Sequence, residues 1–173
     1  MSESYNICLD VGGTKVLGAI FNEKDEIIFR LKKRSKSSGE GSADVEKVII
    51  SVVEEMIRES GIDRSKLNAI ASCAPGVIDQ DKGIVLFTPN LPWRNYDIAG
   101  AMRKKFGVPF FVGNDVNLGV LGEYKFGAAR GYPQCIQSGY HLASLFGLIW
   151  PDGGFESHDA LPICWRRPGE RCT

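Results

Sequence analysis

The sequence has no run of the ~18 apolar residues that a membrane-spanning helix needs, and no basic and apolar leader at its start. Its five cysteines form no Cys-x-x-Cys pair, which argues against a disulfide framework or a zinc knuckle. Basic and acidic residues balance at 21 each, so that neither nucleic acid nor an anionic membrane is indicated as a partner. These absences predict a cytoplasmic protein that binds a small molecule or another protein.

Two common nucleotide-binding signatures are also missing. There is no Gly-x-x-x-x-Gly-Lys-Ser/Thr, and the early glycines do not fit a Gly-x-Gly-x-x-Gly that opens a helix. Instead, two apolar runs between Tyr5 and Phe21 flank a polar turn and predict a pair of buried strands. Asp10 ends the first strand, where its carboxylate could hold a hydrated Mg²⁺.

The turn itself contains Gly12, Gly13, Thr14 and Lys15. Glycines without a Cβ let an anion approach the backbone N–H groups, while the hydroxyl and the ammonium add polar contacts. An ordinary hairpin with glycines in its turn is the alternative. The order Asp-x-Gly-Gly-Thr between two strands resembles the first phosphate motif of the sugar kinase, Hsp70 and actin superfamily, which favours phosphate binding.

A helix is expected where apolar residues from Val45 to Ile57 recur at three- and four-residue spacing, ending at Gly61. Cys8 and Cys73 lie in apolar strand contexts and are expected to be small core residues. The segment from Thr88 to Asn95 contains two prolines and predicts a loop that displays Asn90, Trp93 and Arg94. Asp97 is expected to cap a short helix.

Asn114 and Asp115 follow the apolar run from Val108 to Val112 directly. Polar residues at the end of a buried strand are in the usual place for ligand contact in open α/β sheets. The alternative is that Asp115 only caps the helix that follows.

Five motifs then follow one another in a fixed order between residues 5 and 132. They are Asp10-Val-Gly-Gly-Thr14-Lys15, Ala74-Pro-Gly76-Val-Ile-Asp79, Thr88-Pro-Asn90-Leu91, Asn114-Asp115-Val-Asn117, and Gly122-Glu123 before Phe126-Gly-Ala-Ala-Arg130-Gly131. In this order the sequence resembles the N-terminal lobe of the ROK family of bacterial sugar kinases and sugar-responsive repressors. The resemblance implies an α/β fold of the actin-like ATPase (ribonuclease H-like) type, with a five-stranded mixed sheet flanked by helices.

The same resemblance implies roles for individual residues in an ATP-dependent hexose kinase. Asp115 would be the general base that takes the proton of the sugar hydroxyl. The other implied contacts are to the sugar from Gly76, Asn90 and Asn114, to the ATP phosphates from Gly12, Gly13, Thr14 and Lys15, and to Mg²⁺, through water, from Asp10. Glucose is the expected substrate because glucokinases are common in the family.

Residues 133–173 depart from this pattern. They contain both histidines of the sequence but no lysine. They also lack the three motifs of the family's second lobe, which are a Gly-Thr-Gly-x-Gly-Gly-Gly loop, a Glu-x-Gly-His motif and a cysteine cluster. We therefore interpret residues 1–132 as the kinase lobe and residues 133–173 as an atypical tail, such as a frameshift would leave, with a divergent extension as the alternative. Zinc is expected only in the family's second lobe, and the irregular spacing of His141, His158, Cys164 and Cys172 predicts no metal site.

Two rival functions remain at this point. A repressor of the same family needs a helix-turn-helix before the first strand, and only about four residues precede it here. Alternatively, the 173-residue chain is a non-catalytic fragment, because both lobes of such a kinase must close on ATP. We expect sugar and ATP as the partners of the parent enzyme, no nucleic acid or membrane, and self-association through the cleft face as an open alternative.

Overall fold

The computed structural model describes residues 3–34, 42–127, 130, 136–137, 145–149 and 155–159. The chain divides into two compact units, Met1–Asp115 and Val116–Thr173. Within the described residues, no helix combines the length and the apolar character that crossing a membrane requires.

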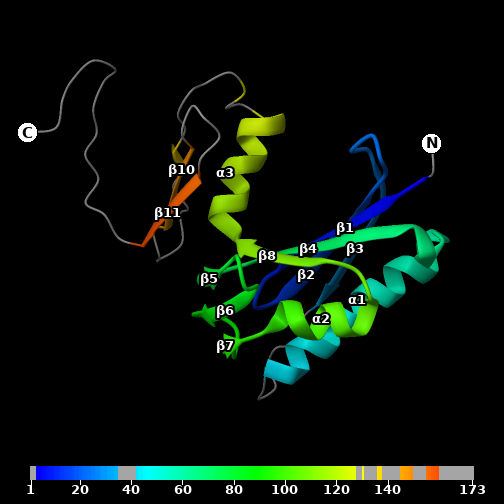
Figure 1. The fold of residues 1–173 in the computed structure, drawn as a ribbon, viewed down its shortest axis with the longest axis horizontal. Helices are drawn as coiled ribbons and strands as arrows, with labels where there is room; N and C mark the ends of the chain where they lie inside the picture. The colour runs from blue at the N-terminus through cyan, green and yellow to red at the C-terminus, as the bar shows by residue number, and fades with distance from the viewer. Residues whose placement is uncertain are drawn as a thin grey trace, which may run out of the picture. The chain divides into compact units, whose positions relative to one another are not determined.

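A five-stranded mixed sheet forms the centre of the first unit (Figure 1). Its strands are β1 (Tyr5–Val11), β2 (Lys15–Phe21), β3 (Ile27–Arg34), β4 (Leu67–Ala74) and β8 (Phe110–Asn114), in the order β3-β2-β1-β4-β8. The three N-terminal strands pair antiparallel, whereas β4 is parallel to β1 and β8 is parallel to β4. The predicted fold class, a five-stranded mixed sheet flanked by helices, is confirmed.

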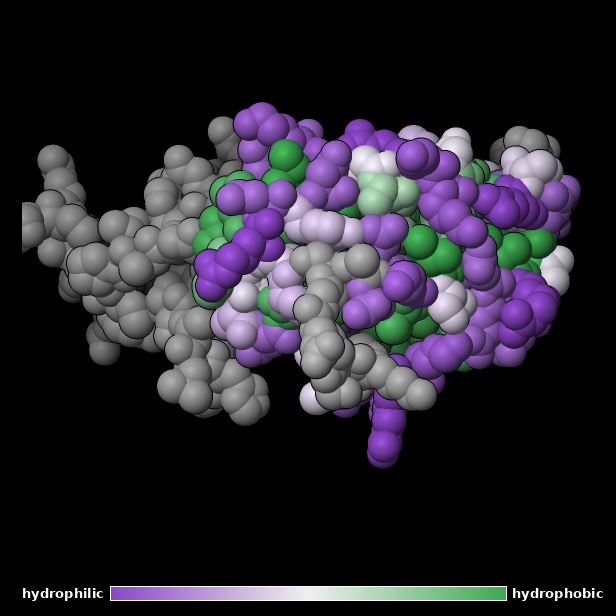
Figure 2. All heavy atoms as spheres, turned by 90° about the horizontal axis from the view of Figure 1, so that it is seen from below, coloured by the Kyte–Doolittle hydropathy of each residue, from purple (hydrophilic) through white to green (hydrophobic). Residues whose placement is uncertain are grey.

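Helices α1 (Ser42–Ser60) and α2 (Ile98–Phe106) cover one face of this sheet (Figure 1). The apolar stripe predicted for α1 is buried, with Ile49, Val52 and Met56 inaccessible to solvent. Gly18 of β2 lies under this helix, because a Cβ at that position would stand 2.3 Å from the sulfur of Met56. The described residues on the side that Figure 2 shows are mostly hydrophilic, as expected for the outward surfaces of such helices.

Buried and more exposed side chains alternate along the strands and so mark the two faces of the sheet. Ile7, Leu9 and Val11 of β1 are buried on the helix side, whereas Cys8 between them is exposed. The expectation that Cys8 is a core residue is therefore wrong, because successive side chains of a strand point to opposite faces.

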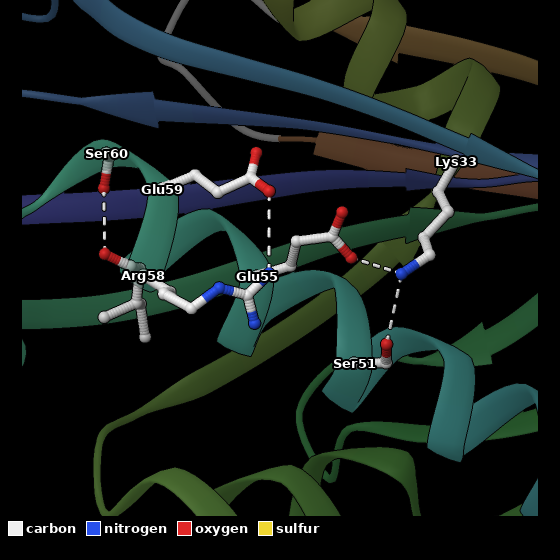
Figure 3. A network of polar contacts seen from close by, with 7 residues as sticks. Lys33, Ser51, Glu55, Arg58, Glu59 and Ser60 are labelled. Carbon is white, nitrogen blue, oxygen red and sulfur yellow. Dashed lines mark hydrogen bonds and ion pairs between the residues drawn. The ribbon is translucent and has the colours of Figure 1, made fainter.

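Lys33 links the edge strand β3 to α1 (Figure 3). Its ammonium forms an ion pair with Glu55 and donates a hydrogen bond of 3.3 Å to Ser51 Oγ. The side chain of Lys33 thus points to the helix side. Its neighbours at even positions, Lys32 and Arg34, point to the opposite face.

A small antiparallel sheet follows β4. It consists of β5 (Val77–Asp79), β6 (Ile84–Phe87) and β7 (Arg94–Tyr96). The predicted display of Trp93 is wrong, since the indole is only 1% exposed and stacks on Tyr96 with ring centroids 5.9 Å apart. Arg94 is exposed as predicted, although it lies in β7 rather than in a loop, with its guanidinium over the Phe87 ring.

The short helices and the second unit complete the chain. A 3-10 turn at Arg64–Lys66 precedes β4, and Asp97 caps α2 as predicted, with its Oδ1 accepting from the Gly100 N–H at 2.7 Å. α3 (Asp115–Phe126) leads into the second unit, where β9 (Ile136–Gln137), β10 (Leu145–Ile149) and β11 (Phe155–Asp159) form an antiparallel sheet. His158 belongs to β11, whereas His141, Cys164 and Cys172 fall outside the described residues. The separate origin of residues 133–173 stays a prediction.

Candidate functional site

The carboxyl ends of the parallel strands β1, β4 and β8 bring the predicted polar residues to one edge of the sheet. Asp10 pairs with Cys73 across β1 and β4, and Ala74 pairs with Asn114 across β4 and β8. Asp115 follows Asn114 immediately, and it is half-buried. Residues separated by more than a hundred positions in the sequence thus meet at the edge where open α/β sheets bind ligands.

The predicted phosphate turn connects β1 and β2 at the same edge. The N–H of Gly12 donates to the carbonyl of Lys15 at 3.0 Å and closes the turn. Thr14 and Lys15 are exposed there. A Cβ at Gly13 would stand 3.1 Å from the carbonyl oxygen of Asn90, so the turn and the loop expected to bind sugar lie in contact.

Gly76 forms a tight corner after β4. Its φ is +108°, a region that side chains with a Cβ rarely adopt, and a Cβ there would lie 2.1 Å from the carbonyl oxygen of Phe87. The side-chain amide of Asn114 donates to the carbonyl of Gly76 at 2.9 Å, and Asn114 is only 4% exposed. The hydrogen bond fixes this corner against the end of β8.

Thr88 supports the loop that carries Asn90, a role that the sequence analysis missed. Its buried hydroxyl accepts from the N–H of Leu91 at 2.8 Å and donates to the carbonyl of Leu91 at 2.9 Å. A threonine just before a turn is a known signal for such local bonding, and it could have been recognised from the Thr-Pro-Asn-Leu spacing. Asn90 itself is exposed at the tip.

Cys73 lies between two carboxylates at the edge of the sheet. Burial above all, together with the negative charges of Asp10 and Asp115, raises the pKa of its thiol from the ordinary value of 9.0 to about 12. The thiol also donates to Asp10 Oδ1 at 3.5 Å. Cys73 is thus a neutral, half-buried group beside the site and not the fully buried core residue that its apolar strand context predicts.

We expect this raised pKa to suppress alkylation of Cys73 in the native protein. At pH 8, iodoacetamide should modify Cys73 about a hundredfold or more slowly in the folded protein than after unfolding in urea, because only the thiolate reacts. The exposed Cys8 provides an internal comparison and should react faster than Cys73. Because its pKa is about 12, the thiol of Cys73 stays mostly neutral below pH 12. The rate of alkylation at Cys73 should therefore increase as the pH is raised towards 12.

Peptide mapping by mass spectrometry gives both rates in one sample. Asp10→Asn removes a neighbouring negative charge and should increase the rate at Cys73 but leave Cys8 unchanged. Equal rates at the two cysteines would contradict the assigned environment.

The donor set at this edge fits Mg²⁺ bound with phosphates better than a closed metal cage. Asp10 supplies one exposed carboxylate at the phosphate turn, and Mg²⁺ is commonly held by one or two carboxylates together with phosphate oxygens and water. Across the described part of the chain, no cluster of three or more His, Cys, Asp or Glu side chains could hold a metal on its own.

The sheet order, the glycine turn between β1 and β2, and the polar residues after β8 define one lobe of an actin-like ATPase fold. The chain belongs to the ROK family, whose sequence profile matches residues 6–138.

Relatives with different functions match the chain to a similar degree. A xylose repressor of Bacillus subtilis (strain 168) is 32% identical over 146 residues, which cover 84% of this chain and 37% of the repressor. A glucokinase of Thermotoga maritima is 34% identical over 156 residues, which cover 90% of this chain and 45% of the glucokinase. The chain therefore spans less than half the length of these relatives.

A solved structure agrees with the fold. A ROK family glucokinase from Streptomyces griseus, crystallised in complex with glucose and AMPPNP, superposes with a TM-score of 0.73 at 27% identity. The match covers 88% of this chain and 46% of the glucokinase. Both sugar kinases and repressors are thus members of the family to which the chain belongs.

Proposed function

We propose that the full-length protein transfers a phosphoryl group from ATP to a hexose, with glucose as the substrate and glucose 6-phosphate as the product. In this proposal residues 1–132 supply the sugar-binding lobe and the catalytic carboxylate. The observation that carries it is the convergence of Asp10, Asp115 and the phosphate turn at one sheet edge, in a chain similar to glucokinases. Proton transfer from a sugar hydroxyl requires a carboxylate near the phosphates, whereas sugar binding alone does not require one.

Asp115 is proposed to take the proton of the sugar hydroxyl as its oxygen attacks the γ-phosphate. Its half-buried position at the start of α3 leaves the carboxylate able to reach a ligand while it is shielded from bulk water. Asn114, Gly76 and Asn90 are proposed to line the sugar pocket. Since Asn114 holds the Gly76 corner, the pocket wall is set before sugar binds.

The turn from Gly12 to Lys15 is proposed to face the phosphates. Its backbone N–H groups and the Lys15 ammonium would stabilise charge on the transferred group, the main catalytic requirement of phosphoryl transfer. Asp10 would hold Mg²⁺ through water, and bound Mg²⁺ would neutralise charge on the phosphates. The adenosine would bind in the remainder of the full-length protein, so the 173-residue chain alone is expected to be inactive.

A coupled assay of the full-length protein tests the proposal. Glucose-dependent production of ADP should be measured beside N-acetylmannosamine, fructose, allose and xylose, with enzyme-free and sugar-free controls. Turnover with glucose that exceeds turnover with the other sugars supports the proposal. The absence of ATP consumption with every sugar would refute it.

The second candidate is a sugar-responsive transcriptional repressor, which the similarity to the xylose repressor favours. Binding of the full-length protein to its own upstream DNA, released by xylose or glucose, would support this function. Such release without any phosphorylated sugar product would decide between the two.

A further inference from the structure

Two stacked aromatic rings lie at the end of the sugar loop, which we define as residues 88–93 between β6 and β7. The indole of Trp93 is almost parallel to the ring of Tyr96, at an interplanar angle of 8°. Side chains three positions apart in a regular strand point to opposite faces. Asn95 lies between the two residues with a φ of +47°, a conformation that asparagine tolerates better than most residues. The backbone turn at Asn95 thus lets both rings lie on one side.

Tyr96 joins these rings to helix α1. Its hydroxyl donates a hydrogen bond to the carboxylate of Glu46, although the two residues are 50 positions apart in the sequence. Both side chains are half-buried, and hydrogen bonds to a carboxylate are stronger than those between neutral groups. Burial above all, together with the hydrogen bond to Glu46, raises the pKa of Tyr96 to about 12. At neutral pH the hydroxyl therefore keeps the proton that it donates.

Glu46 is itself held in place by the packing of α1. Its neighbour Val45 is 2% exposed, and Ile49 one turn further on is inaccessible to solvent. Further along the helix, Glu55 forms the ion pair with Lys33 of β3 (Figure 3). A hydrogen bond to Glu46 thus connects Tyr96 to the central sheet through a helix that is fixed at several points.

The sugar loop needs this connection because its internal bonds determine only its shape. The two hydrogen bonds between Thr88 and Leu91 close the loop on itself. They do not fix where the loop lies relative to α1. The contact that does so begins at Trp93, at the C-terminal end of the loop, and passes through Tyr96 to Glu46.

We propose that Glu46 and Tyr96 are positioning residues for sugar binding, whose hydrogen bond holds the sugar loop where Asn90 can reach the sugar. This inference rests on the proposed function, in which Asn90 lines the sugar pocket. Neither Glu46 nor Tyr96 touches the substrate. They act through the Trp93 ring and the backbone of the loop.

The proposal predicts a particular kinetic effect. A contact between Asn90 and a sugar hydroxyl that does not react has the same strength in the ground state and in the transition state. Its loss therefore raises KM for the sugar and leaves kcat unchanged. A bond that only stabilised the fold would change neither quantity in the folded protein.

The test compares the full-length wild-type protein with Tyr96→Phe, which removes the hydroxyl but keeps the ring that stacks on Trp93. KM for glucose should increase about tenfold, as expected for the loss of a hydrogen bond to a charged group, with kcat within twofold of wild type. Calorimetric titration should show the same loss of glucose affinity. Glu46→Ala should match Tyr96→Phe, and the double variant should be no weaker than either, because all three lack the same bond. Glu46→Gln keeps an oxygen acceptor and should stay within twofold of wild type.

Glu55→Ala is the matched control, because it exchanges another half-buried glutamate of α1 that contacts β3 and not the sugar loop. It should lower the urea midpoint of unfolding but leave glucose affinity within twofold. Equal loss of affinity in Glu55→Ala would overturn the proposal, because any weakening of α1 would then suffice. Unchanged glucose affinity in Tyr96→Phe would overturn it as well, whatever happens to stability.

Titration with glucose and with xylose separates this inference from the proposed function. If the full-length protein consumes no ATP with any sugar, the proposed function fails, but a tenfold loss of affinity for either sugar in Tyr96→Phe still supports the positioning role. Turnover with glucose at an unchanged KM in Tyr96→Phe overturns this inference alone. Absence of binding of both sugars to the wild-type protein overturns both.

Discussion

Asp115→Asn in the full-length protein is expected to lower kcat for sugar phosphorylation about a thousandfold, the usual contribution of a general base. The amide keeps the size and most of the hydrogen-bonding shape of the carboxylate but cannot accept the hydroxyl proton. Sugar affinity should therefore stay within about threefold of wild type, because a group that acts mainly in the transition state contributes little to ground-state binding.

Steady-state kinetics with ATP and glucose give kcat, and calorimetric titration with glucose gives the affinity. Asp81→Asn is the matched control, because Asp81 is exposed in the turn between β5 and β6 and should leave both quantities unchanged. If Asp115→Asn turned over at the wild-type rate, the carboxylate would only cap α3, and the base would have to be sought elsewhere.

Gly76→Ala is expected to lower the free energy of unfolding by about 3 kcal/mol, from the combined cost of a positive φ and of overpacking. The new Cβ would meet the backbone carbonyl of Phe87, which cannot rotate aside as a side-chain end could. The corner that Asn114 holds would shift, so sugar binding should weaken as well.

Gly107→Ala separates the two causes. Gly107 also has a positive φ, of +74°, but no atom lies within 4 Å of the position of its Cβ. Its substitution should cost only the backbone term, about 1 kcal/mol. Urea unfolding followed by intrinsic fluorescence measures both variants, and equal losses of stability would show that the contact with Phe87 is relieved at little cost.

The regular parts of the first unit could be predicted because periodicity reports directly on burial. The stripe of α1 and the strand that ends at Asn114 follow from side-chain spacing alone, and the positions of Asp10 and Asp115 at one edge follow from parallel strand ends. Cys8 could also have been placed correctly, since Ile7 and Leu9 already occupy the buried side.

Other features depend on tertiary contacts that a linear pattern does not contain. Trp93 lies between two short elements with no periodicity, so its burial, where it stacks on Tyr96, depends on tertiary packing. From the sequence alone, the run from Lys32 to Arg34 is interpreted as a solvated strand end. That Arg34 lies opposite Lys15 becomes known only from the pairing of β2 with β3. The contact between Gly13 and Asn90 likewise joins segments separated by 77 positions in the numbering.

That contact has a thermodynamic consequence for the proposed enzyme. Because the backbone of the phosphate turn lies close to the backbone of the sugar loop, we expect a movement of one loop on ligand binding to shift the other. Occupancy of the two sites is then coupled, and linkage requires the coupling to be reciprocal. If bound sugar changes the affinity for the phosphoryl donor by some factor, the bound donor changes the affinity for sugar by the same factor. The two substrates would then not bind independently of each other at equilibrium.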